Sequence, residues 1–119
     1  MEFHAYQGLE TGSRETCTHV VKHNDVVLAF TCALNPGNEE FGQYLAKHGD
    51  GVRDIAMSVE DAKTTYERAV SRGAKSIVPP TELKDEFGSC IVATIQTYGD
   101  TWHSLIQNVD YTGPFLPGF

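Results

Sequence analysis

The sequence predicts an α+β fold in which β-strands predominate. Four segments rich in β-branched and aromatic residues are typical of strands: 16–22, 26–33, 90–97 and 102–109. Two further segments carry apolar residues at the spacing of an amphipathic helix and separate the strands into groups. At 119 residues, the chain is long enough for one domain whose core needs neither a disulfide framework nor a structural metal.

The first half of the chain is predicted to form a three-stranded sheet followed by a helix. Alternating residues over 3–7 predict the first strand, and the turn residues 23–25 (HND) join the next two strands into a hairpin. Residues 35–38 (NPGN) interrupt the strand pattern, and Asn38 is suited to cap a helix. A short amphipathic helix over 41–48 is then expected.

The sequence of the second half of the chain predicts the element order β-α-β-β-β. Small or polar residues alternate with large apolar ones over 54–59, which predicts a strand whose large face, with Ile55 and Met57, packs beneath a helix. The strand that begins at Ala74 is expected to stop at the proline pair 79–80, because proline lacks the N–H that a sheet requires.

A helix is expected directly after the strand over 54–59. Asp61 is suited to its N-cap and Gly73 to its end. Its apolar stripe is expected to comprise Ala62, Tyr66, Ala69 and Val70. Near the C-terminus, Tyr98-Gly99-Asp100 supplies the turn between the last two strands.

Composition narrows the possible partners and the compartment. A formal charge of −7 and a pI near 5.0 argue against binding to nucleic acid or to anionic membranes. No apolar run approaches the ~18 residues that span a bilayer, and the N-terminus has no signal-peptide pattern. Cys17, Cys32 and Cys90 are odd in number and form no CxxC motif, which favours free thiols and a cytoplasmic protein.

Candidate metal ligands are few and poorly spaced. His19 and His23 lie about 13 Å apart along an extended strand, too far to share one ion. Cys17 and His19 share a strand face, which leaves open a Zn²⁺ site or a thiolate pair beside the simpler interpretation of a solvated face. His48 is expected to end the first helix, where a positive imidazole suits the helix dipole, and His103 to lie in the core or line a pocket.

Several segments resemble the 4-hydroxyphenylpyruvate dioxygenase family, specifically its N-terminal half. They occur in the family's order across nearly the whole chain, so together they are far more specific than any one alone. The segments are YQGLETGSRE (6–15), ALNPGN (33–38), LAKHGDGVRDIAMSVED (45–61), IQTYGDTWHSL (95–105) and FLPGF (115–119).

The resemblance implies a vicinal-oxygen-chelate fold, built from paired βαβββ modules, and a cytoplasmic enzyme of tyrosine and phenylalanine catabolism. The family's enzymes are non-haem Fe(II) dioxygenases that convert 4-hydroxyphenylpyruvate and O₂ to homogentisate. Two His and one Glu from the C-terminal half hold the iron. This chain is expected to end before that half begins.

The resemblance also bears on Asp54. The family's catalytic half has a stretch much like GVRDIA, with a His iron ligand where this chain has Asp54, and a Glu ligand near the level of Ser104. A carboxylate opposite a serine is a poor Fe(II) site, so Asp54 is expected instead to bind loop amides of the HGDG turn (48–51). We therefore expect no catalytic, cofactor-binding or metal-ligating residue in this chain.

The module pattern implies a single N-terminal-type domain over 1–119. We expect a partial first module at about 1–48 that lacks its opening strand and helix, a second module at about 49–110, and an extended tail at 111–119. Incomplete modules leave strand edges unpaired, so the chain is expected to associate with the missing C-terminal catalytic half or to form a homo-oligomer.

Two functions follow from these expectations. The first is an N-terminal structural domain, or fragment, of a 4-hydroxyphenylpyruvate dioxygenase-like enzyme, inactive alone because the iron-binding half is absent. The alternative is a stand-alone vicinal-oxygen-chelate module that binds a small ligand or mediates dimerisation. A metalloenzyme that uses Cys17, His19 or His103 finds no support in their spacing.

Overall fold

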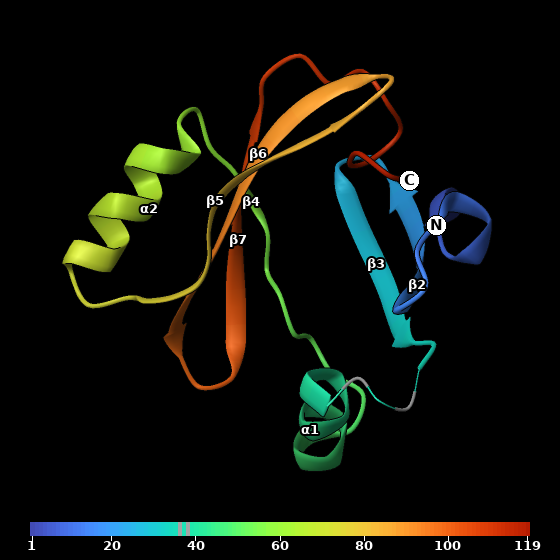
Figure 1. The fold of residues 1–119 in the computed structure, drawn as a ribbon, viewed down its shortest axis with the longest axis horizontal. Coiled ribbons are helices and arrows are strands. Elements are labelled where there is room, and N and C mark those ends of the chain that lie inside the picture. Colours follow the sequence, from blue (N-terminus) through green and yellow to red (C-terminus); the bar gives the residue numbers. More distant parts are fainter. Residues whose placement is uncertain (36, 38) are drawn as a thin grey trace. The chain divides into compact units, whose positions relative to one another are not determined.

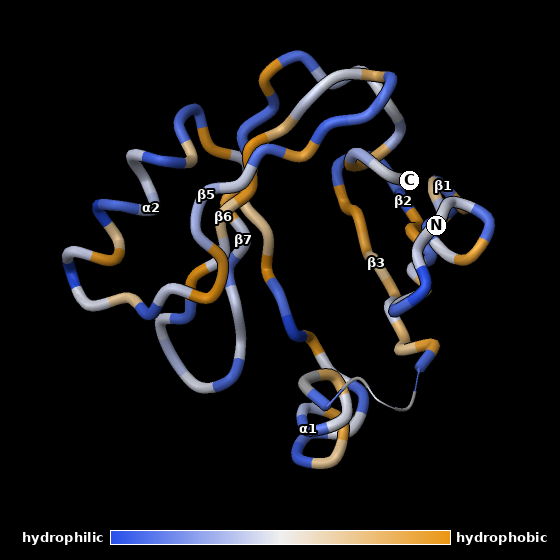
Figure 2. The backbone as a smooth tube through the Cα atoms, in the orientation of Figure 1, coloured by the Kyte–Doolittle hydropathy of each residue, from blue (hydrophilic) through white to orange (hydrophobic). Residues whose placement is uncertain are grey.

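The computed structural model describes residues 1–35, 37 and 39–119, so the expected cap at Asn38 lies outside the described residues. The chain divides into two compact units, Met1–Asp50 with Gly113–Phe119, and Gly51–Thr112. The elements are β1 (Glu2–Gln7), a short 3₁₀ helix η1 (Leu9–Thr11), β2 (Thr16–His23), β3 (Val26–Ala33), α1 (Glu39–His48), β4 (Met57–Ser58), α2 (Ala62–Ser71), β5 (Lys75–Asp85), β6 (Gly88–Tyr98) and β7 (Thr101–Asn108). Figure 1 labels β2 to β7 and both α-helices, and Figure 2 labels β1.

The first unit is built on an antiparallel sheet in the order β1-β2-β3. A two-residue turn joins β2 to β3, and Asn24 adopts a left-handed φ of 53° there, a conformation that asparagine tolerates well. The predicted hairpin is therefore confirmed. Ala5 of β1 and Val20 of β2 are paired and buried. The Thr18 and Thr31 hydroxyls share a 2.8 Å hydrogen bond between β2 and β3.

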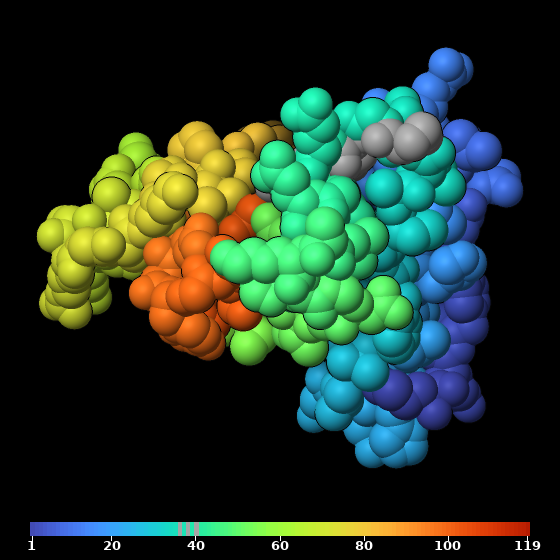
Figure 3. All heavy atoms as spheres, turned by 90° about the horizontal axis from the view of Figure 1, so that it is seen from below, coloured from blue at the N-terminus to red at the C-terminus, as the bar shows by residue number. Residues whose placement is uncertain are grey.

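Strand β3 is one of the two edge strands of the first unit's sheet. It is mostly hydrophobic along its length (Figure 2), yet Val26, Leu28 and Phe30 are 56%, 44% and 60% exposed. Atoms of this hairpin are visible on the surface in the space-filling view (Figure 3). The helix α1 follows, with Phe41 and Tyr44 half-buried.

The second unit contains a four-stranded sheet in the order β4-β7-β6-β5. Strand β4 pairs with β7 in parallel, and the other neighbours are antiparallel. This arrangement confirms the predicted order β-α-β-β-β. The side chains that form its core are Ala62, Cys90, Ala93, Ile95, Leu105 and Tyr111.

Helix α2 packs across β5, β6 and β7 as its stripe predicts. Asp61 is its N-cap, and its carboxylate accepts a 3.0 Å bond from the Thr64 amide. Ala62 is fully buried, and Tyr66 donates a 2.6 Å hydrogen bond to Ser76 of β5. Among the described residues, neither helix has the length and hydrophobicity that crossing a membrane requires.

The prediction for 54–59 is wrong in two respects. Regular strand is limited to Met57–Ser58, and Asp54 makes only an isolated parallel bridge with Trp102. Ile55 and Met57 are 47% and 44% exposed and so do not pack beneath a helix. The reason is that α2 covers the three strands that follow it in the chain, and β4 lies at the edge of the sheet.

The predicted stop at the prolines is also wrong, because β5 continues to Asp85. The register of β5 against β6 shifts between Val78 and Thr81, so the proline pair 79–80 occupies an irregular part of the ladder. In addition, β5 is an edge strand, where a residue without an N–H can face solvent.

The C-terminal segment is bent, contrary to the expected extended tail. Tyr111 is buried in the second unit. Beyond it, the Pro114 carbonyl lies 2.5 Å from Nε2 of His4, and the Gly118 carbonyl accepts a 3.4 Å bond from Gln7. The segment 113–119 therefore lies against β1 within the first unit.

Gly88, at the start of β6, provides a test of close backbone packing. Its φ is +124°, and an added Cβ would lie 2.4 Å from the Asp110 carbonyl oxygen. We expect Gly88→Ala to lower the free energy of unfolding by about 3 kcal/mol. Gly99→Ala is the matched control, because Gly99 has a φ of +50° and no atom near its absent Cβ; it should cost about 1 kcal/mol. Equal losses in urea denaturation would contradict the packing argument.

Asp110 should make stability depend on pH. Its carboxylate accepts bonds of 2.7 and 2.9 Å from the amide and hydroxyl of Ser89, and these bonds lower the pKa of Asp110. The stabilisation is therefore complete above the ordinary aspartate pKa of about 3.9 and is lost as the pH falls through the lower pKa of the folded state.

We expect Asp110→Asn to lower the urea midpoint at pH 6, with the difference from the parent shrinking as the pH falls below about 4. Urea titrations at several pH values measure this difference. A difference that stayed constant over that range would show that the Asp110 charge does not contribute.

Candidate functional site

The segment after Gly51 runs beside β7. It brings together two of the segments that resemble the dioxygenase family, 45–61 and 95–105. The Trp102 amide donates a 2.7 Å bond to the Arg53 carbonyl, and the Ile55 amide donates a 3.0 Å bond to the Trp102 carbonyl. Further along, the Val59 amide donates a 2.9 Å bond to Ile106. These parallel contacts place GVRDIA next to TWHSL within the second unit.

Asp54 and Ser104 form a hydrogen-bonded pair at the centre of this contact. Oδ1 of Asp54 accepts a 3.0 Å bond from the Ser104 amide, and Oδ2 accepts a short bond from the Ser104 hydroxyl. The expectation that Asp54 binds amides of the 48–51 turn is not what the structure shows. Because Asp54 bridges to β7, its carboxylate extends along that strand to Ser104.

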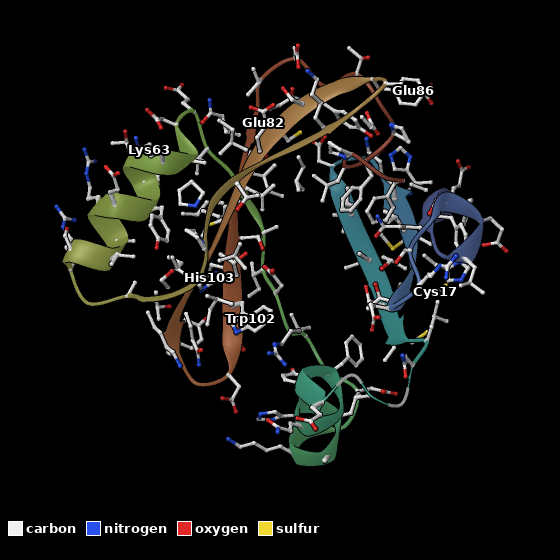
Figure 4. All side chains as sticks on the ribbon, in the orientation of Figure 1. Cys17, Lys63, Glu82, Glu86, Trp102 and His103 are labelled. Carbon is white, nitrogen blue, oxygen red and sulfur yellow. The ribbon has the colours of Figure 1, made fainter. Side chains whose placement is uncertain are left out.

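Cationic and aromatic residues lie next to Asp54 and Ser104 along their two segments. The Arg53 guanidinium lies 3.8 Å from the centre of the Trp102 ring, a cation–π contact that the sequence did not predict. Figure 4 labels Trp102 and His103 on β7. His103 is half-buried, with Nδ1 3.3 Å from the Ile55 carbonyl and its ring against Tyr98.

The arrangement has acid, hydroxyl and imidazole groups but no cluster of metal donors. Within residues 1–35, 37 and 39–119, no three His, Cys, Asp or Glu side chains are grouped closely enough to hold an ion. Both oxygens of Asp54 already accept bonds from Ser104. The Asp54–Ser104 pair links the 53–59 segment to β7.

A second polar cluster lies on the sheet of the first unit. Sγ of Cys17 is 3.7 Å from Nε2 of His19, which confirms that the two residues share a strand face. The His19 ring packs against the Tyr6 ring, with centroids 5.0 Å apart. The Tyr6 hydroxyl donates a 2.6 Å bond to Glu10, which raises the pKa of Tyr6 and lowers that of Glu10.

The other histidines behave as structural residues. His48 is the last residue of α1, as predicted, and its ring stacks on Tyr44 with centroids 4.8 Å apart. His23 ends β2 beside the hairpin turn. Two shallow hollows, of about 200 and 340 Å³, are lined by residues around Phe3 and Lys22 and around Arg72 and Thr97 rather than by Asp54.

Solved structures define the class of fold. The chain superposes on a mutant 4-hydroxymandelate synthase from Streptomyces coelicolor with a TM-score of 0.84 and 28% identity, over 98% of this chain and 32% of that one. A hypothetical protein from Bacillus halodurans gives 0.71 at 11% identity, and a methylmalonyl-CoA epimerase 0.69 at 16%. The predicted vicinal-oxygen-chelate fold is confirmed.

Sequence relatives then identify the family, although no family model matches the chain. It is 48% identical over 122 residues to 4-hydroxyphenylpyruvate dioxygenase of Tetrahymena thermophila, and 45% identical over 116 residues to that of Dictyostelium discoideum. These matches cover 99% and 97% of the chain. The chain belongs with the 4-hydroxyphenylpyruvate dioxygenase family, and it spans about 30% of the length of these relatives.

The Asp54–Ser104 pair can be tested by a double-mutant cycle. We expect Ser104→Ala to lower the free energy of unfolding by about 1 kcal/mol, because it removes the bond from the Ser104 hydroxyl. Asp54→Ala should lower it further, because it also removes the bond that the Ser104 amide donates. The double variant should then be little worse than Asp54→Ala alone. Urea denaturation measures all four proteins, and strictly additive losses would show that the two side chains are not coupled.

Proposed function

We propose that this chain is a non-catalytic structural domain of a 4-hydroxyphenylpyruvate dioxygenase-like enzyme. The observation that supports this proposal is the pairing of Asp54 with Ser104. The family resemblance assigns iron ligands to the corresponding positions of the catalytic half. In this chain, those two positions carry a carboxylate and a hydroxyl that hydrogen-bond each other.

The chemistry of iron supports the same conclusion. Non-haem Fe(II) dioxygenases use two imidazoles and one carboxylate and leave coordination sites open for substrate and O₂. Neither Asp54 nor Ser104 offers an imidazole, and the nearby His103 is directed to the Ile55 carbonyl. We propose that Fe(II) and 4-hydroxyphenylpyruvate are bound by a catalytic part outside these residues, and that this chain is inactive alone.

The proposed partner is that catalytic part or a second copy of the chain. In the first unit, β3 exposes an apolar strand at the edge of its sheet. Exposed strand edges of this kind favour pairing with another chain segment. The free thiols favour a cytoplasmic location, and the family resemblance suggests a role in tyrosine and phenylalanine catabolism.

A second candidate is a stand-alone module that binds a small ligand or mediates dimerisation. The hypothetical protein from Bacillus halodurans favours it, because this chain covers 79% of that protein with a TM-score of 0.71. A protein of this fold can therefore consist of little more than the elements described above. At 11% identity, however, the likeness concerns the fold and no particular ligand.

An activity assay separates the two candidates. The purified chain is mixed anaerobically with Fe(II), then supplied with 4-hydroxyphenylpyruvate and O₂, and homogentisate is measured. We expect no product above the metal-only background, while the full-length Dictyostelium discoideum dioxygenase serves as the positive control. Turnover with one tightly bound iron per chain would overturn the structural role, and thermal stabilisation by the substrate without turnover would favour the binding module.

A chimera tests the structural role directly. In the Tetrahymena thermophila relative, the segment that matches this chain is replaced by residues 1–119, and iron content and turnover are measured. We expect both to be retained. The same chimera carrying Asp54→Ala should keep its iron and turnover but unfold at a lower urea concentration. Loss of iron in that variant would place Asp54 among the metal ligands.

A further inference from the structure

Two cysteines face each other across the hairpin of the first unit. Cys17 of β2 and Cys32 of β3 are direct register partners in the antiparallel pairing. Directly opposed residues in such a pair have Cα atoms about 4.5 to 5.5 Å apart, and a disulfide needs about 4.4 to 6.8 Å. The backbone therefore already places these two residues at a distance that a disulfide can bridge.

Both thiols are free and accessible, whereas the third is protected. Cys32 is exposed and Cys17 half-buried, while Cys90 is only 2% exposed within the second unit. Burial also raises the pKa of Cys90, which keeps that thiol protonated and unreactive. Electrophilic reagents that thiolates attack should therefore distinguish the hairpin pair from Cys90.

His19 supplies a proton acceptor for one thiol of the pair. Its Nε2 lies 3.7 Å from Sγ of Cys17, and His19 is itself exposed, so it can pass a proton to water. The thiolate is the nucleophile in thiol–disulfide exchange, and an adjacent imidazole assists its formation. Cys17, labelled in Figure 4, is therefore placed to react first and Cys32 to follow.

We propose that Cys17 and Cys32 form a reversible cross-strand disulfide in response to low-molecular-weight disulfides such as oxidised glutathione. The Cys17 thiolate, its proton taken by His19, attacks one sulfur of the oxidant and releases one glutathione thiolate. The Cys32 thiolate then attacks Sγ of Cys17 and releases the second glutathione. In total, two protein thiols are oxidised to one disulfide, and one glutathione disulfide is reduced to two thiols.

Geometry indicates that this disulfide is easily reduced. The Cβ atoms of opposed residues lie about 4.5 to 5.5 Å apart, beyond the ~3.8 Å mean of disulfides. The bond would draw the strands together and carry strain, and strained exposed disulfides are the labile ones. It would tie the exposed edge strand β3 to β2 at the open end of the hairpin, next to the 2.9 Å bond from the Leu34 amide to the Glu15 carbonyl.

The test is oxidation of the 119-residue chain with excess oxidised glutathione under native conditions. We expect the three thiols to fall to one, the mass to fall by about 2 Da, and peptide mapping to link Cys17 with Cys32. Dithiothreitol should restore all three thiols. A stable glutathione adduct, a disulfide-linked dimer, or a linkage that includes Cys90 would overturn the proposal.

Variants separate the chemistry from misfolding. Cys32→Ser should stop at the mixed disulfide on Cys17 and gain the mass of one glutathione, with an unchanged far-ultraviolet circular dichroism spectrum. His19→Gln should reach the same final disulfide but about fivefold more slowly at neutral pH. Equal rates in the parent and His19→Gln would exclude His19 as the proton acceptor.

Discussion

The parallel contact between residues 53–59 and β7 is the constraint on which the candidate site depends. Backbone hydrogen bonds from the Trp102 amide to Arg53 and from the Ile55 amide to Trp102 fix the relative position of the two segments. These bonds involve no side chain. Given that position, Asp54 meets Ser104 and Arg53 covers Trp102. Because these side chains contact one another, we infer that the site holds the 53–59 segment against β7.

Local chemistry explains what the sequence could predict. The hairpin turn, the Asp61 cap and the stripe of α2 each depend on residues close together in the chain, so patterns reveal them. The strand was wrongly predicted to end at the prolines, because a sheet accommodates proline only where the strand lies at an edge. Ile55 was wrongly predicted to be covered, because its exposure depends on which strands α2 covers. Those facts belong to the assembled sheet and to no local pattern.

The two side-chain pairs, Asp54–Ser104 and Cys17–Cys32, also differ in whether the local sequence could predict them. Ser104 lies 50 residues after Asp54, so their hydrogen bonds follow only from the parallel contact between their segments. The pairing of Cys17 with Cys32, by contrast, follows from the two-residue turn at Asn24 and Asp25, because the turn fixes which residues of β2 and β3 lie opposite each other. Turn chemistry alone therefore determines which thiols meet.

We propose that Asp54 belongs to a hydrogen-bonded contact with Ser104 and not to an iron site. Crystals of the chain soaked anaerobically in ferrous salt, with anomalous scattering recorded at the iron edge, test it most directly. We predict no ordered ion near Asp54 and intact hydrogen bonds from Ser104 to its carboxylate. An occupied ion held by Asp54 together with imidazoles of this chain would contradict it.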